Sequence, residues 1–213
     1  MLDWIYKKKC YFCGKSSESV KMCSSCYDDM DFLDFSVNRS FKDVPIFCAG
    51  LYSKNLQKMI RGLKYHNQKE LAYYQAKFMF QYWQNLGLKG DFQVVPVPIY
   101  YKRLKKRKYN HMELVANEFV KFFQDGDGSY CVNNSLIARI KDTKPQYKLN
   151  KSQRMMNLEN AFEVYKENYI RGKRILIIDD ICTTGSTFEE MIKALNNCGL
   201  YDIICFATTT PFD

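Results

Sequence analysis

Long apolar runs are missing from this chain. No segment approaches the roughly 20 consecutive apolar residues that a membrane-spanning helix needs. Three lysines close the first nine residues and no apolar core follows them, so we predict no secretory signal peptide. Internal repeats and low-complexity segments are also missing. These absences exclude a helical membrane span and a repeat array, and they lead us to expect a cytoplasmic protein.

A disulfide framework is not indicated either. The nine cysteines are an odd number, and while four cluster near the N-terminus, the other five are scattered. Secreted domains that depend on disulfides use paired cysteines, so this distribution favours a reducing compartment. Cys182 has no histidine or other base close to it in sequence, and we predict no nucleophile there. We expect the scattered thiols to be small core residues: Cys48, Cys131, Cys182, Cys198 and Cys205.

The composition supports a folded core with a basic surface. With 213 residues, 46% of them hydrophobic, the chain can form one ordinary domain plus a small module. The net charge is +9. Such a charge, when clustered, attracts polyanions, although a solvated surface would explain many of the single lysines. The basic residues gather in two windows, which hold Lys102, Arg103, Lys105, Lys106, Arg107 and Lys108, and then Arg139, Lys141, Lys144, Lys148, Lys151 and Arg154.

Four cysteines near the N-terminus have the spacing of a metal site. Cys10 and Cys13 form one Cys-x₂-Cys pair, and Cys23 and Cys26 form a second. Two such hairpins can place four sulfurs about 2.3 Å from one zinc ion and leave no open coordination position, so we predict a structural zinc. Reduced free cysteines and an iron–sulfur cluster are the alternatives. We place the zinc knuckle in residues 1–40 and the main domain in residues 41–213.

The most informative segment runs from Arg174 to Thr187. The apolar residues 175–178 lead directly into Asp179 and Asp180, as in a parallel strand that is covered on both faces. Small hydroxylated residues and one glycine follow, and a helical pattern then begins. The N-terminus of a helix binds anions through its backbone N–H groups and its dipole. We therefore predict a phosphate-binding loop made of Thr183, Thr184, Gly185, Ser186 and Thr187.

The two carboxylates narrow the identity of the anion. Like charges repel, so acids beside a phosphate are explained if they accept hydrogen bonds from sugar hydroxyls, or if a divalent cation such as Mg²⁺ lies between. A sugar phosphate fits this combination best. Both acids can face such a ligand only if the strand ends at Asp179, because neighbouring side chains of a strand point to opposite faces. The alternative is an ordinary turn in which Asp180 caps the helix.

The rest of the chain alternates strands with helices. Helical spacing of the aromatic residues in 70–86 favours core positions over stacking on nucleic-acid bases. The alternation predicts a mostly parallel sheet that binds its ligand at the carboxyl ends of the strands. Both basic windows follow strands and are expected on the same rim, where cations can neutralise a diphosphate leaving group. The expected strands are 47–52, 92–97, 135–140, 161–164 and 202–208, and the expected helices are 53–65, 70–86 and 110–123.

The loop segment resembles the binding motif for phosphoribosyl diphosphate (PRPP) of type I phosphoribosyltransferases. That motif is a hydrophobic strand, two acids, two variable residues, Thr-Gly and a small hydroxyl pair, and every position matches here. The resemblance implies a type I phosphoribosyltransferase-like α/β fold. It also implies that Asp179 and Asp180 hold the ribose hydroxyls, that residues 183–187 cradle the 5′-phosphate, and that Mg²⁺ bridges diphosphate and ribose. Our candidates for the diphosphate are Arg107, Arg139 and Lys141.

A wider resemblance, to the competence-associated ComF family, covers nearly the whole chain. It includes the four-cysteine knuckle and an Arg-Gly-Phe-Asn-Gln element, in which Lys108, Tyr109 and His111 here replace Gly, Phe and Gln. No nucleobase-recognition segment can be identified. The other matching residues are Tyr52, Ile60, Leu63, Lys64, Tyr65, Val95, Pro96, Val97, Pro98, Arg103, Arg107, Asn110, Arg139, Thr143, Gln146, Arg154, Asn157, Ala161 and Phe162.

The ComF resemblance implies a zinc knuckle fused to a PRPP-binding domain, in a family linked to natural transformation and the handling of imported single-stranded DNA. Expected partners are PRPP, single-stranded DNA and DNA-processing or competence proteins. One hypothesis is a phosphoribosyltransferase, a glycosyltransferase with an unknown acceptor. The alternative is a non-catalytic single-stranded DNA-binding protein that uses PRPP as a cofactor or signal. A PRPP-binding regulator ranks last, because no DNA-reading helix is evident.

Overall fold

The computed structural model describes residues 9–17, 21–34, 39–123, 128–143 and 158–211. Its main feature is a six-stranded sheet in the order β1-β2-β8-β7-β3-β4, in which only the edge strand β1 is antiparallel to its neighbour. The prediction of a mostly parallel α/β sheet is confirmed. The strands are β1 (Arg39–Phe41), β2 (Val44–Leu51), β3 (Phe92–Pro96), β4 (Tyr130–Val132), β7 (Arg174–Ile181) and β8 (Ile203–Thr210).

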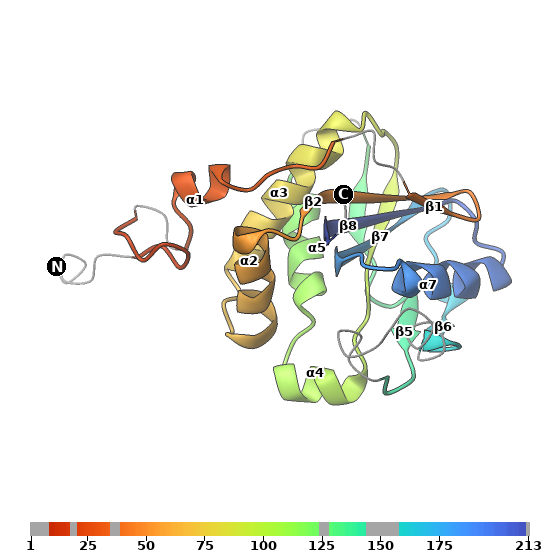
Figure 1. Cartoon of the computed structure of the whole chain (residues 1–213). Coiled ribbons are helices and arrows are strands. Elements are labelled where there is room, and N and C mark those ends of the chain that lie inside the picture. The colour runs from red at the N-terminus through yellow and green to blue at the C-terminus, as the bar shows by residue number, and fades with distance from the viewer. Residues whose placement is uncertain (1–8, 18–20, 35–38, 124–127, 144–157, 212–213) are drawn as a thin grey trace.

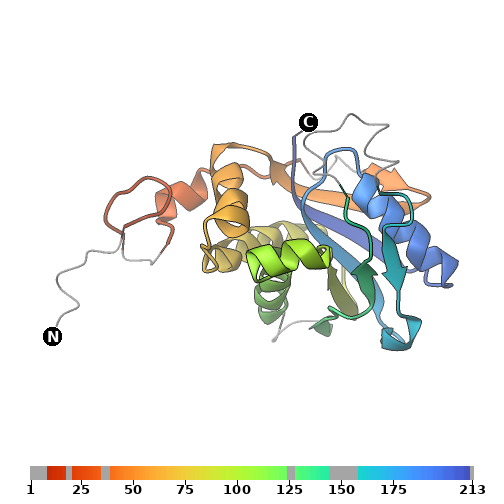
Figure 2. The same ribbon diagram turned by 90° about the horizontal axis from the view of Figure 1, so that it is seen from below.

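Helices cover both faces of this sheet. Figures 1 and 2 show α2, α3 and α5 on one side and α7 on the other. The central strands are therefore enclosed, which explains why residues 175–178 and the whole of β8 are buried. No helix among the described residues combines the length and the apolar character needed to cross a membrane. The covering helices are α2 (Lys54–Tyr65), α3 (Leu71–Asn85), α5 (His111–Lys121) and α7 (Ser186–Asn197).

The aromatic residues of α3 are mainly core residues, as their helical spacing predicted. Phe78, Tyr82 and Trp83 are almost completely buried. Trp83 packs edge-on against Phe92 of β3, with ring centroids 5.6 Å apart. These rings fill the space between helix and sheet, so they do not form a platform for stacking bases.

One local prediction was wrong. The strand expected over 135–140 leaves the main sheet, since β5 (Ile137–Arg139) forms a separate two-stranded sheet with β6 (Phe162–Val164), antiparallel to it, in the part of the chain that the structure describes. The strand that pairs with β3 at this side of the sheet is β4. It has three residues and is too short to show the alternation of a strand in the sequence. Most of the first basic window lies in a helix, α4 (Tyr101–Arg107). It ends at Lys108, which adopts a left-handed φ of 72° where the resembled element has glycine.

The cysteine knuckle packs on α2. It contains the short helix α1 (Ser24–Asp28), and the chain after it reaches β2, where Leu33 N donates to Ala49 O at 3.0 Å. The knuckle thus rests on the helix that carries Lys64 towards the sheet. Three polar contacts join it to α2 and the residue after it: Asn55 Nδ2 donates to Cys26 O (3.0 Å), Lys58 Nζ donates to Phe12 O (2.8 Å), and Tyr11 Oη meets His66 Nδ1 (2.7 Å).

Candidate functional site

The two adjacent aspartates lie on opposite faces of β7. The strand continues to Ile181 instead of ending at Asp179, so its side chains keep alternating through both acids. Asp180 points towards α2 and α5 and is 4% exposed. Asp179 is partly exposed, and it lines a small depression together with the loop that follows the strand. Because the strand does not end at Asp179, the two carboxylates do not face the same ligand.

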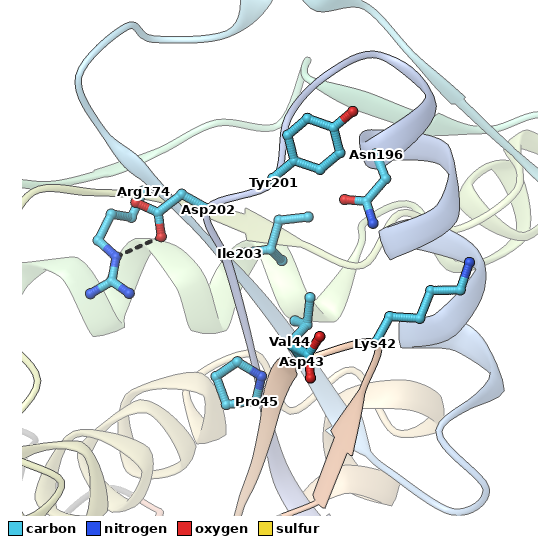
Figure 3. A pocket seen from close by; sticks show the side chains of 9 residues that line it. All are labelled: Lys42, Asp43, Val44, Pro45, Arg174, Asn196, Tyr201, Asp202 and Ile203. Carbon is cyan, nitrogen blue, oxygen red and sulfur yellow. Dashed lines mark hydrogen bonds and ion pairs between the residues drawn. The ribbon is translucent and has the colours of Figure 1, made fainter.

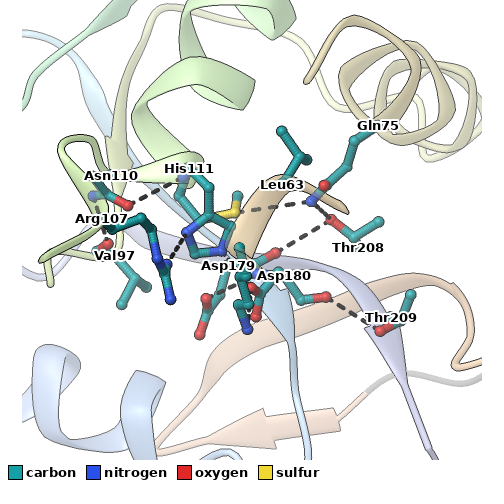
Figure 4. A network of polar contacts seen from close by, with 12 residues as sticks. Leu63, Gln75, Val97, Arg107, Asn110, His111, Asp179, Asp180, Thr208 and Thr209 are labelled. Atoms are coloured by element: carbon teal, nitrogen blue, oxygen red, sulfur yellow. Dashed lines mark hydrogen bonds and ion pairs between the residues drawn. The ribbon is translucent and has the colours of Figure 1, made fainter. Parts of the chain in front are cut away.

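Asp180 is the centre of a buried ionic cluster, which Figure 4 shows in part. Lys64 Nζ, at the end of α2, lies 2.5 Å from Asp180 Oδ2, and His111 Nε2 contacts the same oxygen. Arg107 Nη1 then lies 3.0 Å from the other ring nitrogen of His111, Nδ1. The cluster links the acid pair to α2, α4 and α5.

Charge pairing decides the protonation states in this cluster. Burial opposes ionisation of Asp180, but Lys64 and His111 outweigh it and hold the pKa of that carboxyl below its usual range. Burial likewise opposes the charge on Lys64, but Asp180 outweighs it and raises the pKa of the ammonium group. Burial lowers the pKa of His111, and the cations Lys64 and Arg107 add to that effect against the pull of Asp180. Near neutral pH the cluster therefore holds an ionised Asp180–Lys64 pair and a neutral imidazole.

Asp179 has the opposite electrostatic environment. Burial raises the pKa of its carboxyl to about 8, and the neighbouring negative charge of Asp180 adds to the effect. Its Oδ1 accepts a hydrogen bond from the backbone N–H of Asp180 at 2.8 Å. A carboxyl group with this pKa near an opening is typical of a functional position. It is the acid of the pair that a ligand in the depression can reach.

The loop after β7 forms the other wall of the depression. Gly185 has a φ of +82°, and α7 begins at the next residue, Ser186. Ser186 is therefore the first helical residue, and Gly185 is the N-cap. Its Oγ lies 2.7 Å from Thr184 Oγ1. The depression is lined by Asp179, Ile181, Cys182, Thr183, Gly185, Ser186, Thr187 and Phe188.

The two basic windows meet beside this site. Arg103 of α4 donates to the carbonyl oxygen of Thr143, and Arg139 of β5 donates to the hydroxyl of the same threonine. Burial lowers the pKa of Arg139 to about 10, and the nearby charge of Arg103 adds to the effect. Lys141 instead donates to Glu159 O at 2.7 Å. The remaining basic residues of the second window, Lys144, Lys148, Lys151 and Arg154, lie outside the described residues, as do the resembled positions Gln146 and Asn157.

The four N-terminal cysteines converge as a zinc site requires. Their sulfur atoms all lie within 4.8 Å of one another, and those of Cys13 and Cys23 are 3.8 Å apart. Bonds of about 2.3 Å to a tetrahedral zinc place the sulfurs roughly 3.8 Å apart, so the geometry fits. Burial raises the pKa of the Cys10 thiol, but N–H donors from Cys13, Cys23 and Phe12 outweigh it and lower that pKa to about 6. A thiol that readily loses its proton is a ready metal ligand.

Three residues that contact Asp180 or the loop were given no role from the sequence: Lys64, His111 and Arg39. Lys64 follows Leu56 and Ile60 at four-residue spacing on α2, and a lysine in a buried row is a signal of an ion pair. His111 belongs to the resembled element but received no role. Arg39 donates to Thr183 O at 3.1 Å from β1, and nothing in the sequence places β1 beside the loop.

A larger hollow, of about 370 Å³, lies at the amino ends of the strands, where β2, β7 and β8 begin (Figure 3). It is lined by both signs of charge, and Arg174 Nε pairs with Asp202 Oδ1 there at 2.9 Å. None of the predicted site residues reaches it. Ligands of parallel α/β sheets bind at the carboxyl ends of the strands, which favours the depression beside Asp179.

Comparisons with known proteins find similarity over the segment that contains the loop and over most of the chain. A family model described as "Phosphoribosyl transferase domain" matches residues 127–210, which contain β7, the loop and β8. Competence protein F of Haemophilus influenzae is 26% identical over 203 residues, covering 91% of this chain and 86% of that protein. The DNA utilization protein YhgH of Escherichia coli (strain K12) is 23% identical over 212 residues, covering 94% and 90%. The transcriptional regulator GfcR of Methanocella arvoryzae is 57% identical, but only over 35 residues, 16% of this chain and 17% of that protein.

Proposed function

The chain belongs to the ComF family of competence-associated proteins, and from this premise we propose that it binds PRPP with Mg²⁺ and acts in natural transformation. The similarity to competence protein F and YhgH spans almost the whole chain, and the phosphoribosyl transferase domain match covers the loop. One observation carries the proposal: Asp179 and the loop residues Thr183, Gly185, Ser186 and Thr187 line the same depression.

The parts of PRPP are assigned by chemistry. The loop residues Thr183 to Thr187 receive the 5′-phosphate, because hydroxyl groups and the N-terminus of α7 favour an anion there. Asp179 accepts hydrogen bonds from the ribose hydroxyls. Asp180 does not touch the sugar. It pairs with Lys64 and His111 on the opposite face of β7 and so holds in place the strand that carries Asp179. Bound Mg²⁺ would neutralise diphosphate charge.

The diphosphate is assigned to Arg107 and Arg139. Arg107 belongs to the ionic cluster around Asp180, and Asp179 is one of the charges that act on Arg139. Lys141 is the weaker candidate, because its ammonium group already meets the Glu159 carbonyl oxygen. Departure of diphosphate from the ribose would need this positive charge, as charge develops on the leaving group.

We also propose that the protein handles single-stranded DNA. Tyr65 and Tyr101 are 64% and 52% exposed next to the basic helix α4. Arg107 lies over the Tyr65 ring at 5.6 Å from its centroid, and Lys105 lies over the Tyr101 ring at 5.7 Å. Exposed aromatic rings among cations are the pattern that binds single strands, because bases stack while lysines and arginines meet phosphates. This observation favours the alternative in which PRPP serves a DNA-binding protein as a cofactor or signal.

The module organisation completes the proposal. Residues 1–40 form a knuckle that holds one structural zinc through Cys10, Cys13, Cys23 and Cys26, and residues 41–213 form the PRPP-binding domain. None of the nine cysteines, all of which lie among the described residues, forms a disulfide, which supports a cytoplasmic location. DNA-processing or competence proteins are the expected partners. A role as a PRPP-binding regulator, for which the GfcR segment would argue, remains the third choice.

Calorimetric titration of the purified protein with PRPP and Mg²⁺ tests the proposed binding. We expect saturable binding that is lost in Asp179→Ala, with ribose 5-phosphate binding more weakly because it lacks the diphosphate. Incubation of the same complex with single-stranded DNA and with free bases then tests turnover. Release of diphosphate would favour the transferase, and binding without release would favour the cofactor or signal role. A folded protein that gives no heat with PRPP would contradict both.

A further inference from the structure

His111 bridges two residues that belong to different parts of the site. Its Nε2 contacts Asp180 Oδ2 on β7, and its Nδ1 lies 3.0 Å from Arg107 Nη1 on α4. The imidazole is 4% exposed, so it has almost no contact with solvent. The ring therefore connects Asp180 on β7 to Arg107 in the first basic window.

The partners fix the tautomer of the imidazole. A guanidinium group has only N–H donors, so Nδ1 of His111 must accept and carries no proton. The single ring proton then lies on Nε2, where it donates to the carboxylate of Asp180. A neutral imidazole is thus the one form that satisfies both neighbours.

The backbone around the bridge is held independently. Asn110 caps α5 by accepting from Met112 N at 3.1 Å, and it donates to Val97 O at 3.0 Å. Lys108 closes α4 in the left-handed conformation. Arg107 and His111 therefore stand on two helices whose ends are fixed, and their contact determines where the flexible guanidinium points. The ring of Tyr65 supports that guanidinium from the side.

We propose that His111 is a positioning residue, which joins Arg107 to Asp180 and holds the guanidinium in place for the diphosphate of PRPP. This inference rests on the proposed PRPP binding and deepens it. His111 touches no ligand atom itself. It acts through Arg107, so its loss should weaken ligands that carry a diphosphate and spare those that do not.

Two substitutions separate this role from simple core packing. Glutamine offers one acceptor oxygen and one donor NH₂ group, so His111→Gln can keep both contacts, and glutamine is the residue of the resembled family element. Leucine fills similar space but can make neither contact. Only histidine can gain a second proton, and the charged groups that face it are Asp180 from β7, Lys64 from α2 and Arg107 from α4. A proton on Nδ1 would oppose the guanidinium and release it.

The test is calorimetric titration of the wild type, His111→Gln and His111→Leu with PRPP and Mg²⁺, and separately with ribose 5-phosphate. We expect His111→Leu to weaken PRPP binding about 10-fold, as for residues that support a ligand contact, and to leave ribose 5-phosphate unchanged. His111→Gln should retain the affinity. As pH falls below about 6.5, the ordinary pKa of histidine, the wild type should lose PRPP affinity more steeply than His111→Gln, because only the wild-type ring can take up the opposing proton.

Two further measurements keep the outcome decisive. In an Arg107→Leu background, His111→Leu should cause no additional loss, since the two residues act as one unit. The chain has two histidines, so ¹⁵N spectra of the His66 and His111 rings can show directly whether His111 carries its proton on Nε2. Equal weakening of both ligands, an added loss in the Arg107→Leu background, or a proton on Nδ1 would overturn the inference while leaving PRPP binding intact. A wild type that binds neither ligand would instead overturn the proposed function, and this inference with it.

Discussion

Lys64 and Asp180 form an ion pair with a 2.5 Å separation between Nζ and Oδ2, and both side chains are largely buried. The pair joins the end of α2 to β7, the strand that precedes the loop 183–187. Asp179, the preceding residue, faces the depression and accepts a hydrogen bond from the backbone N–H of Asp180, and burial together with the charge of Asp180 raises its pKa, whereas that of Asp180 is lowered. Two adjacent acids of the same type therefore lie in opposite environments, which is the basis for the separate roles that we propose for them.

Replacing Asp180 should destabilise the fold. Asp180→Asn leaves the Lys64 ammonium buried without its counter-ion, and breaking such a pair from one side costs about 3–5 kcal/mol. Chemical denaturation measures the loss. The double variant Lys64→Met/Asp180→Asn removes both charges and should recover part of the stability. An Asp180→Asn protein as stable as the wild type would show that the pair contributes nothing.

Replacing Asp179 should have the opposite effect on stability. Its folded pKa of about 8 exceeds the ordinary value near 4, so the folded carboxyl retains a proton that the unfolded one has lost. The stability of the wild type therefore falls as pH rises through that window. Asp179→Asn cannot ionise, and we expect it to gain about 1 kcal/mol, or roughly 2–4 °C in melting temperature, at pH 8. Thermal unfolding at pH 4.5 and pH 8 checks the sign, because a gain that is larger at the lower pH contradicts it.

The loop glycine should matter for ligand binding more than for folding. Gly185 and Gly199 have similar φ values, +82° and +77°, and each has room for an added Cβ. Alanine at either place strains the backbone by about 1–2 kcal/mol. Gly185→Ala should in addition weaken PRPP binding, whereas Gly199→Ala, at the far end of α7, should not. Similar affinities for the two variants would remove the loop from the site.

Removing the metal should loosen α2. Chelation is expected to release one zinc ion per chain, and the knuckle then loses the geometry that presents Phe12 O and Cys26 O to Lys58 and Asn55. Hydrogen exchange of the backbone amides of 54–65 should accelerate, while β8 keeps its protection. Cys13→Ser, which removes the exposed ligand, should give the same pattern with less metal bound. Unchanged exchange in α2 after full metal release would show that the knuckle does not support this helix.

The salt dependence of the affinity for single-stranded DNA should identify the DNA-binding surface. Each lysine that meets a phosphate of a single strand adds about 0.7 to the slope of log K against log salt concentration. Lys105→Gln/Lys106→Gln on α4 should therefore reduce the slope by up to about 1.4. Lys166→Gln/Arg171→Gln, a pair of exposed cations near the start of β7, provides the matched control. Equal slopes for the two double variants would exclude α4 as the contact surface.

The fold was predictable because its signals are periodic and long. The apolar run of β7 and the stripes of α2, α3 and α5 each repeat one period over enough residues to identify an element. β4 has only three residues, and β5 joins β6 through a contact between distant parts of the chain. Sequence pattern carries little information about such short strands, so their placement could not be derived.

The candidate site could be proposed from residue types, but the directions of its side chains could not. The loop, the acids and Arg107 were proposed from sequence, because phosphate and sugar chemistry restricts which residues can serve. Which acid faces the depression depends on where β7 ends, and one further strand residue reverses the answer. Lys64 and His111 meet Asp180 through contacts between distant parts of the chain, and no local pattern identifies that partner.

The central claim is that the loop after β7 binds the 5′-phosphate of PRPP while Asp179 accepts hydrogen bonds from the ribose hydroxyls. The most direct measurement is a crystal structure of the protein with PRPP and Mg²⁺. We predict phosphate oxygens against residues 183–187, ribose hydroxyls against Asp179, and diphosphate beside Arg107, with Asp180 still paired to Lys64. PRPP bound in the hollow at the amino ends of the strands, or Asp180 released from Lys64 to hold the sugar, would contradict the account.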